Sequence, residues 1–219
     1  MEHSLSPEEP VATPLPDGYI DVPDGKIASV QTLLHMFAMP ELRPDVAAPP
    51  WTLRAAGPVP SDWYLGVFRR VGEPWLWFSR LLMPDDELRA ILDDPHVRIF
   101  TLRFDGADEG LLELDFRHEG ECELRFLGLT AALIGTGAGR WLMNRALEIA
   151  WAQPISRFWL HSCNLDHPAA LDFYKRSGFV PYARQIEIAD DPRLTSVIRR
   201  DAAPHVPLIR HAPTERSAQ

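Results

Sequence analysis

Cysteine and long apolar runs are scarce in this sequence. Its 219 residues include only two cysteines, Cys122 and Cys163, which are too few for a disulfide framework and favour a reducing compartment. No apolar run approaches the roughly 18 residues of a membrane span. The acidic start, MEHSLSPEEP, lacks the apolar core of a signal peptide. We therefore expect a cytoplasmic protein with no membrane partner.

Basic charge is also in deficit. Lys26 and Lys175 are the only lysines, and the 22 Lys and Arg residues face 31 Asp and Glu, which gives a formal net charge of −9. A nucleic-acid-binding protein needs a basic face, so this balance argues against a nucleic-acid partner. It suits a neutral or cationic small substrate better. The 46% hydrophobic content is ordinary for a globular protein.

Hydrophobic periodicity predicts one mixed α/β domain of helices and mostly antiparallel strands. The first 25 residues, rich in proline and acid, predict an extended arm. Strands are expected at 26–36 and 51–56, paired antiparallel, and later at 97–106, 110–120, 121–129, 156–163 and 179–189. Helices are expected at 61–72 (with Ser61 as N-cap), 84–94, 139–152 and 167–178. The expected division is arm and N-terminal strand at 1–50, domain at 51–190 and tail at 191–219.

A glycine-rich stretch, GTGAGR at 135–140, lies between an apolar strand and a helix. Small residues there allow a ligand to approach the backbone, and the helix N-terminus favours an anion. A tight turn without a ligand is the alternative. A P-loop would require Gly-Lys-Ser/Thr at the end, where Arg140 and Trp141 stand. A dinucleotide fingerprint would follow the first strand of a βαβ unit, whereas this loop follows predicted hairpins.

Two segments together resemble a known family. ECELRFLGLTAALIGTGAGRWLM (121–143) and DHPAALDFYKRSGF (166–179) resemble the GNAT superfamily of acyl-coenzyme A-dependent N-acetyltransferases, particularly a bacterial subgroup with DHPAAL at this place. The family loop reads Gln/Arg-x-x-Gly-x-Gly/Ala. Gly137 and Gly139 match it, and Ile134 replaces the polar first residue. In the second motif His167 takes the place of the usual Asn. The resemblance implies a GNAT-like sheet flanked by helices, extended here by an N-terminal strand and arm.

The resemblance also implies roles for individual residues. Glu123, on the strand that leads to the loop, would be the general base, and Tyr174 the general acid, because a phenol can protonate a departing thiolate. The alternatives are a solvated strand glutamate and a core tyrosine. Acetyl-coenzyme A would be the co-substrate, bound by the loop amides and Arg140, by the strand backbone and by His167. The implied cofactor-binding set is Leu127, Leu129, Thr136, Gly137, Ala138, Gly139, Arg140 and His167.

Other constellations carry competing interpretations. Trp75, Trp77 and Phe78 could form an acceptor wall that holds an alkylammonium by cation–π contact, or could simply pack in the core. HSCNLDH (161–167) offers metal ligands, but residues on alternating strand faces do not converge, so no metal is expected. Buried cysteine is likewise preferred over a Cys163–His nucleophile. Glu113 and Asp115 share a strand face, which we expect to be a solvated carboxylate face in preference to a glycosidase pair.

The function predicted from these observations is N-acetyl transfer from acetyl-coenzyme A to a primary amine by direct attack. The acceptor would be a small molecule or a peptide amine. Alternatives are a non-catalytic acyl-coenzyme A-binding sensor or assembly module, and an acyltransferase that uses a larger acyl group. The arm and residues 26–56 would either cover the active site or mediate a homodimer.

Overall fold

The computed structural model describes residues 17–45 and 49–209, and the first 16 residues of the predicted arm lie outside them. Seven strands form a single sheet with the order β2-β3-β4-β5-β6-β1-β7. Every neighbouring pair is antiparallel except β5 and β6. The strands are β1 (Lys26–Met36), β2 (Thr52–Ala56), β3 (Val97–Phe104), β4 (Ala107–Asp115), β5 (Glu121–Leu129), β6 (Arg157–Cys163) and β7 (Val180–Asp190).

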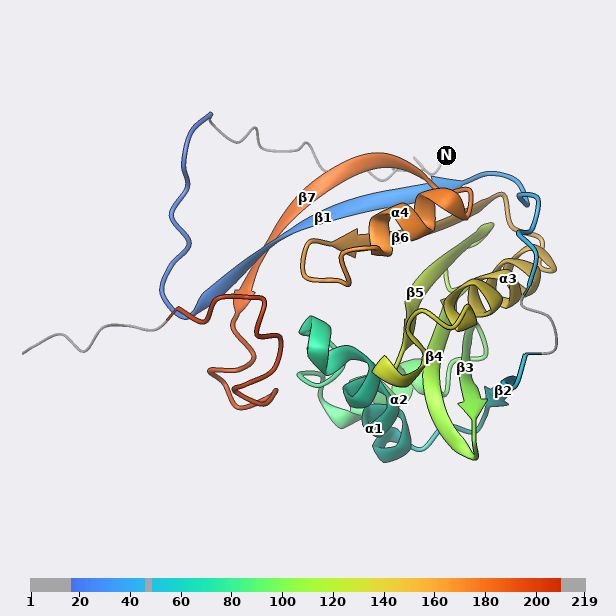
Figure 1. The fold of residues 1–219 in the computed structure, drawn as a ribbon, viewed down its shortest axis with the longest axis horizontal. Helices are drawn as coiled ribbons and strands as arrows, with labels where there is room; N and C mark the ends of the chain where they lie inside the picture. Colours follow the sequence, from blue (N-terminus) through green and yellow to red (C-terminus); the bar gives the residue numbers. More distant parts are fainter. Residues whose placement is uncertain (1–16, 46–48, 210–219) are drawn as a thin grey trace, which may run out of the picture.

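Helices cover both faces of this sheet (Figure 1). They are α1 (Ser61–Gly72), α2 (Asp85–Leu92), α3 (Ala138–Trp151) and α4 (Ala170–Arg176), with short 3₁₀ turns at Glu73–Trp75 and Ala131–Leu133. The expected mixed, mostly antiparallel sheet with flanking helices is confirmed. Within the described residues, no helix has the length and apolar character needed to cross a bilayer.

Two cores lie on opposite faces of the sheet. On one face, α1 buries Tyr64, Val67, Phe68 and Val71, which recur with the spacing of one helix face, together with Leu111 and other strand residues. On the other face, α3 buries a stripe against β3, β4, β5 and β6 that includes the side chains of Trp141, Leu142, Ala146, Leu147 and Ala150. Hydrophobic burial on both faces holds the sheet in one layer between the helices.

Strand β1 was expected to pair with β2, and that prediction was wrong. Instead β1 lies between β6 and β7 and is antiparallel to both, whereas β2 pairs with β3 at the far edge. The long β1–β7 pair, Lys26–Asp190 to His35–Val180, explains the difference because it satisfies far more backbone than the five-residue β2 could. A segment near the N-terminus therefore lies inside the sheet that ends with β7.

Two local expectations also need correction. Pro60, not Ser61, is the N-cap of α1, and Ser61 is the first helical residue. Glu113 and Asp115 are not solvated, because Glu113 is completely buried and Asp115 is 5% exposed. Helix α1 and the segment after it cover this face and supply partners: Tyr64 and Arg80 both hydrogen-bond the Glu113 carboxylate. Burying an isolated carboxylate costs a large free energy, and the hydrogen bonds and ion pair of a paired one offset that cost.

Candidate active site

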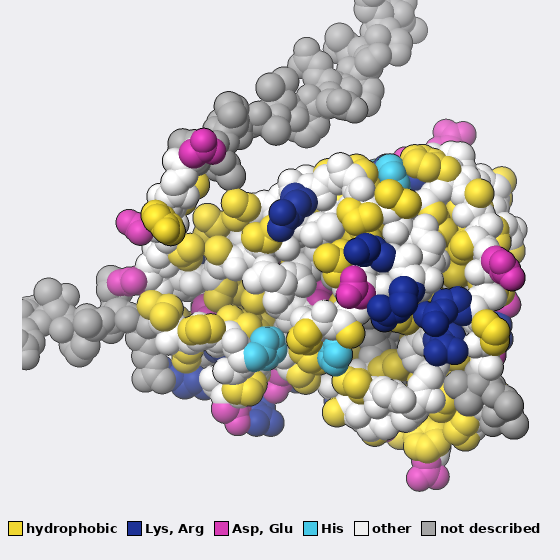
Figure 2. Space-filling model, turned by 45° about the horizontal axis from the view of Figure 1, so that its top comes forward, with side chains coloured by type: hydrophobic (Ala, Val, Ile, Leu, Met, Phe, Trp, Pro, Cys, Tyr) yellow, Lys and Arg dark blue, Asp and Glu magenta, His cyan; other side chains and the backbone are white. Residues whose placement is uncertain are grey.

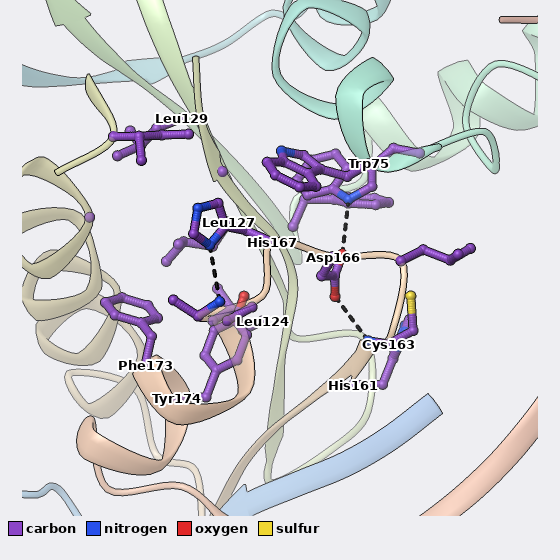
Figure 3. A pocket seen from close by; sticks show the side chains of 18 of the residues that line it. Trp75, Leu124, Leu127, Leu129, His161, Cys163, Asp166, His167, Phe173 and Tyr174 are labelled. Carbon is purple, nitrogen blue, oxygen red and sulfur yellow. Dashed lines mark hydrogen bonds between the residues drawn. The ribbon is translucent and has the colours of Figure 1, made fainter. Parts of the chain in front are cut away.

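Strands β5 and β6 separate at the centre of the sheet. They pair only from Glu121 to Glu123, opposite Arg157 to Trp159. Beyond that point a cavity of about 690 Å³ opens, lined by residues 124–129 of β5 and by His161 and Cys163 of β6. Figure 3 shows Leu127, Leu129, Phe173 and Tyr174 on one side of it, and Trp75, Asp166 and Cys163 on the other. The gap thus joins the α3–α4 side of the sheet to the α1 side.

The glycine-rich loop forms one end of the cavity. Gly135 and Gly137 have φ angles of 82° and 95°, in the left-handed region that favours glycine. Thr136 Oγ1 donates to the Leu133 carbonyl at 2.8 Å and accepts from the Ala138 N–H at 3.3 Å. The loop is thereby folded directly into the first turn of α3.

Three predicted loop residues line the cavity: Gly137, Gly139 and Arg140. Thr136 and Ala138 do not line it, and Ala138 is completely buried. In the first turn of a helix the N–H groups have no intrahelical partner, so those of Gly139 and Arg140 can donate to an anion. Ile134, the departure from the family pattern, also lines the cavity and is 45% exposed.

Further arginines border this end, and sequence reasoning had missed two of them, Arg43 and Arg176. Arg43 precedes a segment that is fixed to α3, because Arg140 Nη1 donates to the Pro44 carbonyl at 3.1 Å and Asn144 Nδ2 donates to the Arg43 carbonyl at 2.7 Å. The space-filling view shows Lys and Arg side chains gathered in one area of the surface (Figure 2). Arg43, Arg140 and Arg176 line the cavity, and with the first-turn amides their guanidinium groups could hold an anionic group such as a phosphate.

The β5 wall is shaped by glycine as well as by Leu127 and Leu129. A Cβ atom at Gly128 would lie 2.8 Å from the Trp77 ring and 2.5 Å from Val71, so only glycine lets Trp77 pack against the strand. Trp77 also contacts the Phe126 ring, with centroids 5.1 Å apart. The aromatic segment after α1 is therefore set directly against the middle of the cavity.

Trp75, Trp77 and Phe78 all line the cavity, as an acceptor wall would. The Trp75 ring contacts two imidazoles, with its centroid 5.1 Å from that of His167 and 5.6 Å from that of His205. Trp77 Nε1 donates to Asp166 at 3.4 Å, and the other Asp166 oxygen accepts from the Ser162 hydroxyl and the Cys163 N–H. Asp166 thus links the aromatic segment to the end of β6, a role that its place in DHPAAL did not reveal.

The two predicted catalytic residues occupy different environments. Tyr174 lines the cavity, and burial raises the pKa of its phenol, so the group stays protonated at neutral pH. Glu123 is 8% exposed and does not line the cavity. Its Oε1 accepts from Arg125 Nη1 at 2.8 Å and lies 3.8 Å from His161 Nε2. Arg125 and His161, which do line the cavity, therefore stand between Glu123 and the cavity.

His167 lies where α4 begins, and its tautomer can be assigned. The Ala169 N–H donates to His167 Nδ1 at 3.1 Å, so Nδ1 carries the lone pair and, in the neutral ring, Nε2 carries the hydrogen. The side chain lines the cavity (Figure 3). His167 can therefore donate one hydrogen bond from Nε2 to a ligand, as the amide of an Asn could.

A cysteine nucleophile and a metal site are the alternatives that the sequence offered for residues 161–167. Burial raises the pKa of the Cys163 thiol to about 11, which leaves it a poor nucleophile at neutral pH. Across residues 17–45 and 49–209, no cluster of three or more His, Cys, Asp or Glu side chains could hold a metal ion.

Comparison with solved structures shows the same fold elsewhere. The chain is similar to a GCN5-related N-acetyltransferase from Sphaerobacter thermophilus, with 15% identity, a TM-score of 0.55, and coverage of 74% of this chain and 52% of that one. It is also similar to a functionally unknown conserved protein from Staphylococcus epidermidis, with 12% identity, a TM-score of 0.50, and coverage of 76% and 63%. The chain thus spans between about half and two thirds of the length of these proteins.

A search among curated proteins found no match. A family model, in contrast, matches residues 65–179, slightly more than half of the chain and the part that holds the glycine-rich loop, Glu123 and Tyr174. The resemblance drawn from the two sequence motifs is confirmed by this match: the chain belongs to the acetyltransferase (GNAT) family.

Proposed function

We propose that this protein transfers the acetyl group of acetyl-coenzyme A to a primary amine by direct attack. The observation that carries the proposal is the cavity through the sheet, with anion-binding amides and arginines at one end and an aromatic, polar wall at the other. Two reactants can therefore enter from opposite faces and meet between β5 and β6. Holding both in one site converts a bimolecular reaction into an effectively unimolecular one.

The cofactor side is assigned to the loop, to β5 and to α4. The N–H groups of Gly139 and Arg140 and the nearby guanidinium groups hold the phosphates. Backbone groups of Leu127 and Leu129 pair with the pantetheine arm, and His167 donates from Nε2. Acetyl-coenzyme A supplies the activated thioester, and a backbone N–H near Leu127 polarises its carbonyl.

The reaction itself requires two proton movements. An alkylammonium must lose a proton before its nitrogen can form the C–N bond, and the departing thiolate must gain one when the C–S bond breaks. Tyr174, kept protonated by burial, donates to the sulfur. Glu123 supplies negative charge on the acceptor side and acts through water or the groups between it and the cavity.

The test is a calorimetric titration with acetyl-coenzyme A, followed by a thiol-release screen over a library of primary amines. We expect saturable binding and turnover with at least one amine. Absence of binding would refute the proposal. Binding without turnover would identify a sensor or assembly module instead, and faster turnover with longer acyl thioesters would identify an acyltransferase for a larger group.

A further inference from the structure

A polar network on β1 and β7 borders the acceptor side of the cavity. Gln31 Nε2 donates to Glu187 Oε2 at 2.7 Å and to Ser29 Oγ at 2.9 Å, and Ser29 Oγ donates to the same carboxylate oxygen at 3.2 Å. The reverse orientation of the Gln31 amide would direct its oxygen at a carboxylate oxygen, which is repulsive. Glu187 and Ser29 therefore fix which way the Gln31 amide points.

This orientation determines the tautomer of His161. Gln31 Oε1 lies 3.2 Å from His161 Nδ1, and an amide oxygen can only accept a hydrogen bond. Nδ1 must therefore carry a hydrogen, and in the neutral ring Nε2 carries the lone pair. His161 Nε2 lies 3.8 Å from Glu123 Oε1. The His161 side chain lines the cavity and is 38% exposed. The available base position of the ring is thus on the side where Glu123 can stabilise a positive charge.

The charges around His161 come from two strands, β5 and β7, and from the loop that holds Asp166. Burial, and then the positive charge of Arg125, lower the pKa of His161 below its usual 6.5, and this outweighs the opposing effect of Glu123, Asp166 and Glu187. The ring is consequently neutral at neutral pH and can accept a proton. Glu123 itself is nearly buried, bonded to Arg125 and absent from the cavity wall.

We propose that His161 is the catalytic base that takes the proton from the acceptor ammonium, with Gln31 and Glu187 as positioning residues that hold it in the Nδ1–H tautomer. This inference rests on the proposed acetyl transfer. It assigns Glu123 the task of stabilising the imidazolium rather than removing the proton directly. It also gives β1, which precedes the matched region 65–179, a part in the chemistry.

Acetyl transfer with His161 as the base conserves every proton. One ammonium N–H bond breaks and a His161 Nε2–H bond forms; the ring later releases this proton to solvent. The neutral amine then forms the C–N bond while the C–S bond breaks. The thiolate takes the Tyr174 phenol proton, and the second amine proton returns to the phenolate. The sum is ammonium plus thioester giving amide, thiol and one released proton.

The first experiment needs no acceptor. Long-range ¹⁵N–¹H NMR spectra of the full chain report the protonation of each imidazole nitrogen, and a His161→Asn variant assigns the signals. We expect the Nδ1–H form and a midpoint below pH 6.5. In Gln31→Met, whose side chain cannot accept the hydrogen bond, the spectrum should move toward the Nε2–H form. An Nε2–H tautomer or a charged ring at pH 7 in the unaltered protein would overturn the inference.

The second experiment measures kcat/KM against pH with the best amine from the screen. His161→Asn should lose at least about 100-fold and lose the acidic limb of the profile, since general-base catalysis contributes about 10²–10⁴-fold. Glu123→Gln should keep that limb and move it to lower pH, because a charge that favours the imidazolium is gone. His118→Asn, an exposed histidine outside the cavity, is the matched control and should be unchanged.

The outcomes of these experiments distinguish the assignment of His161 as the base from the proposed acetyl transfer. If the unaltered protein turns over an amine but His161→Asn keeps the limb and the rate, the base assignment is overturned while acetyl transfer stands. Loss of the limb in Glu123→Gln would make Glu123 the base and also overturn it. If the unaltered protein turns over no amine, acetyl transfer and the base assignment both fall, whereas the NMR spectra still decide the tautomer.

Discussion

The buried carboxylate of Glu113 provides the sharpest test of the packing. It is completely buried under α1, accepts hydrogen bonds from Arg80 and from the Tyr64 hydroxyl, and forms an ion pair with Arg80, whose side chain is 4% exposed. Burial, and then the charge of Glu113, raise the pKa of Tyr64, so its hydroxyl remains a donor. Glu113→Gln keeps the shape of the side chain but leaves the Arg80 charge buried without a counterion.

The expected magnitude follows from that unpaired charge. Removing one partner of a buried ion pair costs about 3–5 kcal/mol, because the other charge stays desolvated. In a chain of this size each kcal/mol lowers Tm by about 2–4 °C, so Glu113→Gln should lower Tm by about 6–20 °C. Tyr64→Phe removes only one hydrogen bond to a charged group and should cost about 1.5–3 kcal/mol. The double variant Arg80→Met/Glu113→Leu removes both charges and should recover much of the loss.

The assay is urea unfolding followed by the fluorescence of the seven tryptophans, with a thermal scan in parallel. The four proteins form a graded series, and the coupling between Arg80 and Glu113 is obtained from a double-mutant cycle that adds the single variants Arg80→Met and Glu113→Leu. Two results would refute the argument: a Glu113→Gln variant as stable as the unaltered protein, or a double variant less stable than either single one. Either would mean that the pair is not desolvated in solution.

Further predictions concern single residues of the site and of the C-terminal segment. Tyr174→Phe should lower kcat by about 10²-fold or more with little change in acetyl-coenzyme A affinity, and an unchanged kcat would remove it as the acid. Gly137→Val forces a β-branched residue into φ 95°, which costs about 1–3 kcal/mol and should weaken cofactor binding in a calorimetric titration. Cys163→Ala should keep the rate within about 3-fold, because a thiol of pKa about 11 is almost wholly protonated at neutral pH; a larger loss contradicts this. Burial alone would raise the pKa of Asp191, but the hydrogen bonds that Arg193 donates to it outweigh burial and lower the pKa. The contribution of Asp191 to the free energy of unfolding is therefore present above its pKa in the unfolded chain and is lost as pH falls through its pKa in the folded protein. Asp191→Asn should therefore lose less stability than the unaltered protein between about pH 5 and 2, measured by urea unfolding.

Local patterns were sufficient to predict most elements. Residues 26–36 and 61–72 were expected as a strand and a helix, and the structure gives those bounds. The glycine-rich loop was also predicted to precede a helix, and that helix begins at Ala138, one residue before the expected start. The left-handed φ angles at Gly135 and Gly137 are local properties as well. Short-range turn, cap and periodicity signals are carried by the sequence itself.

Strand pairing and burial were harder, because they depend on residues far apart in the chain. Nothing in residues 26–36 indicates that they pair with 158–163 and 180–190 rather than with 52–56. The burial of Glu113 depends in the same way on Arg80, 33 residues earlier. The position of His161 beside Glu123 also could not be predicted from the sequence, since these side chains meet only across two strands.

The division of the cavity explains why family membership says more about the cofactor than about the acceptor. Gly137, Arg140, His167 and Tyr174, which we assign to the cofactor side, all line the cavity and lie inside the matched region 65–179. Part of the opposite wall comes from Ser29 and Gln31 on β1 and Glu187 on β7, outside that region, whereas other polar residues of that wall, such as His161 and Asp166, lie inside it. Strand β1 lies between β6 and β7, so substitutions on β1 or β7 alter this part of the wall directly. Neither strand carries the glycine-rich loop or α3. Substitutions on β1 and β7 should therefore change which amine is acetylated, while the affinity for acetyl-coenzyme A stays constant.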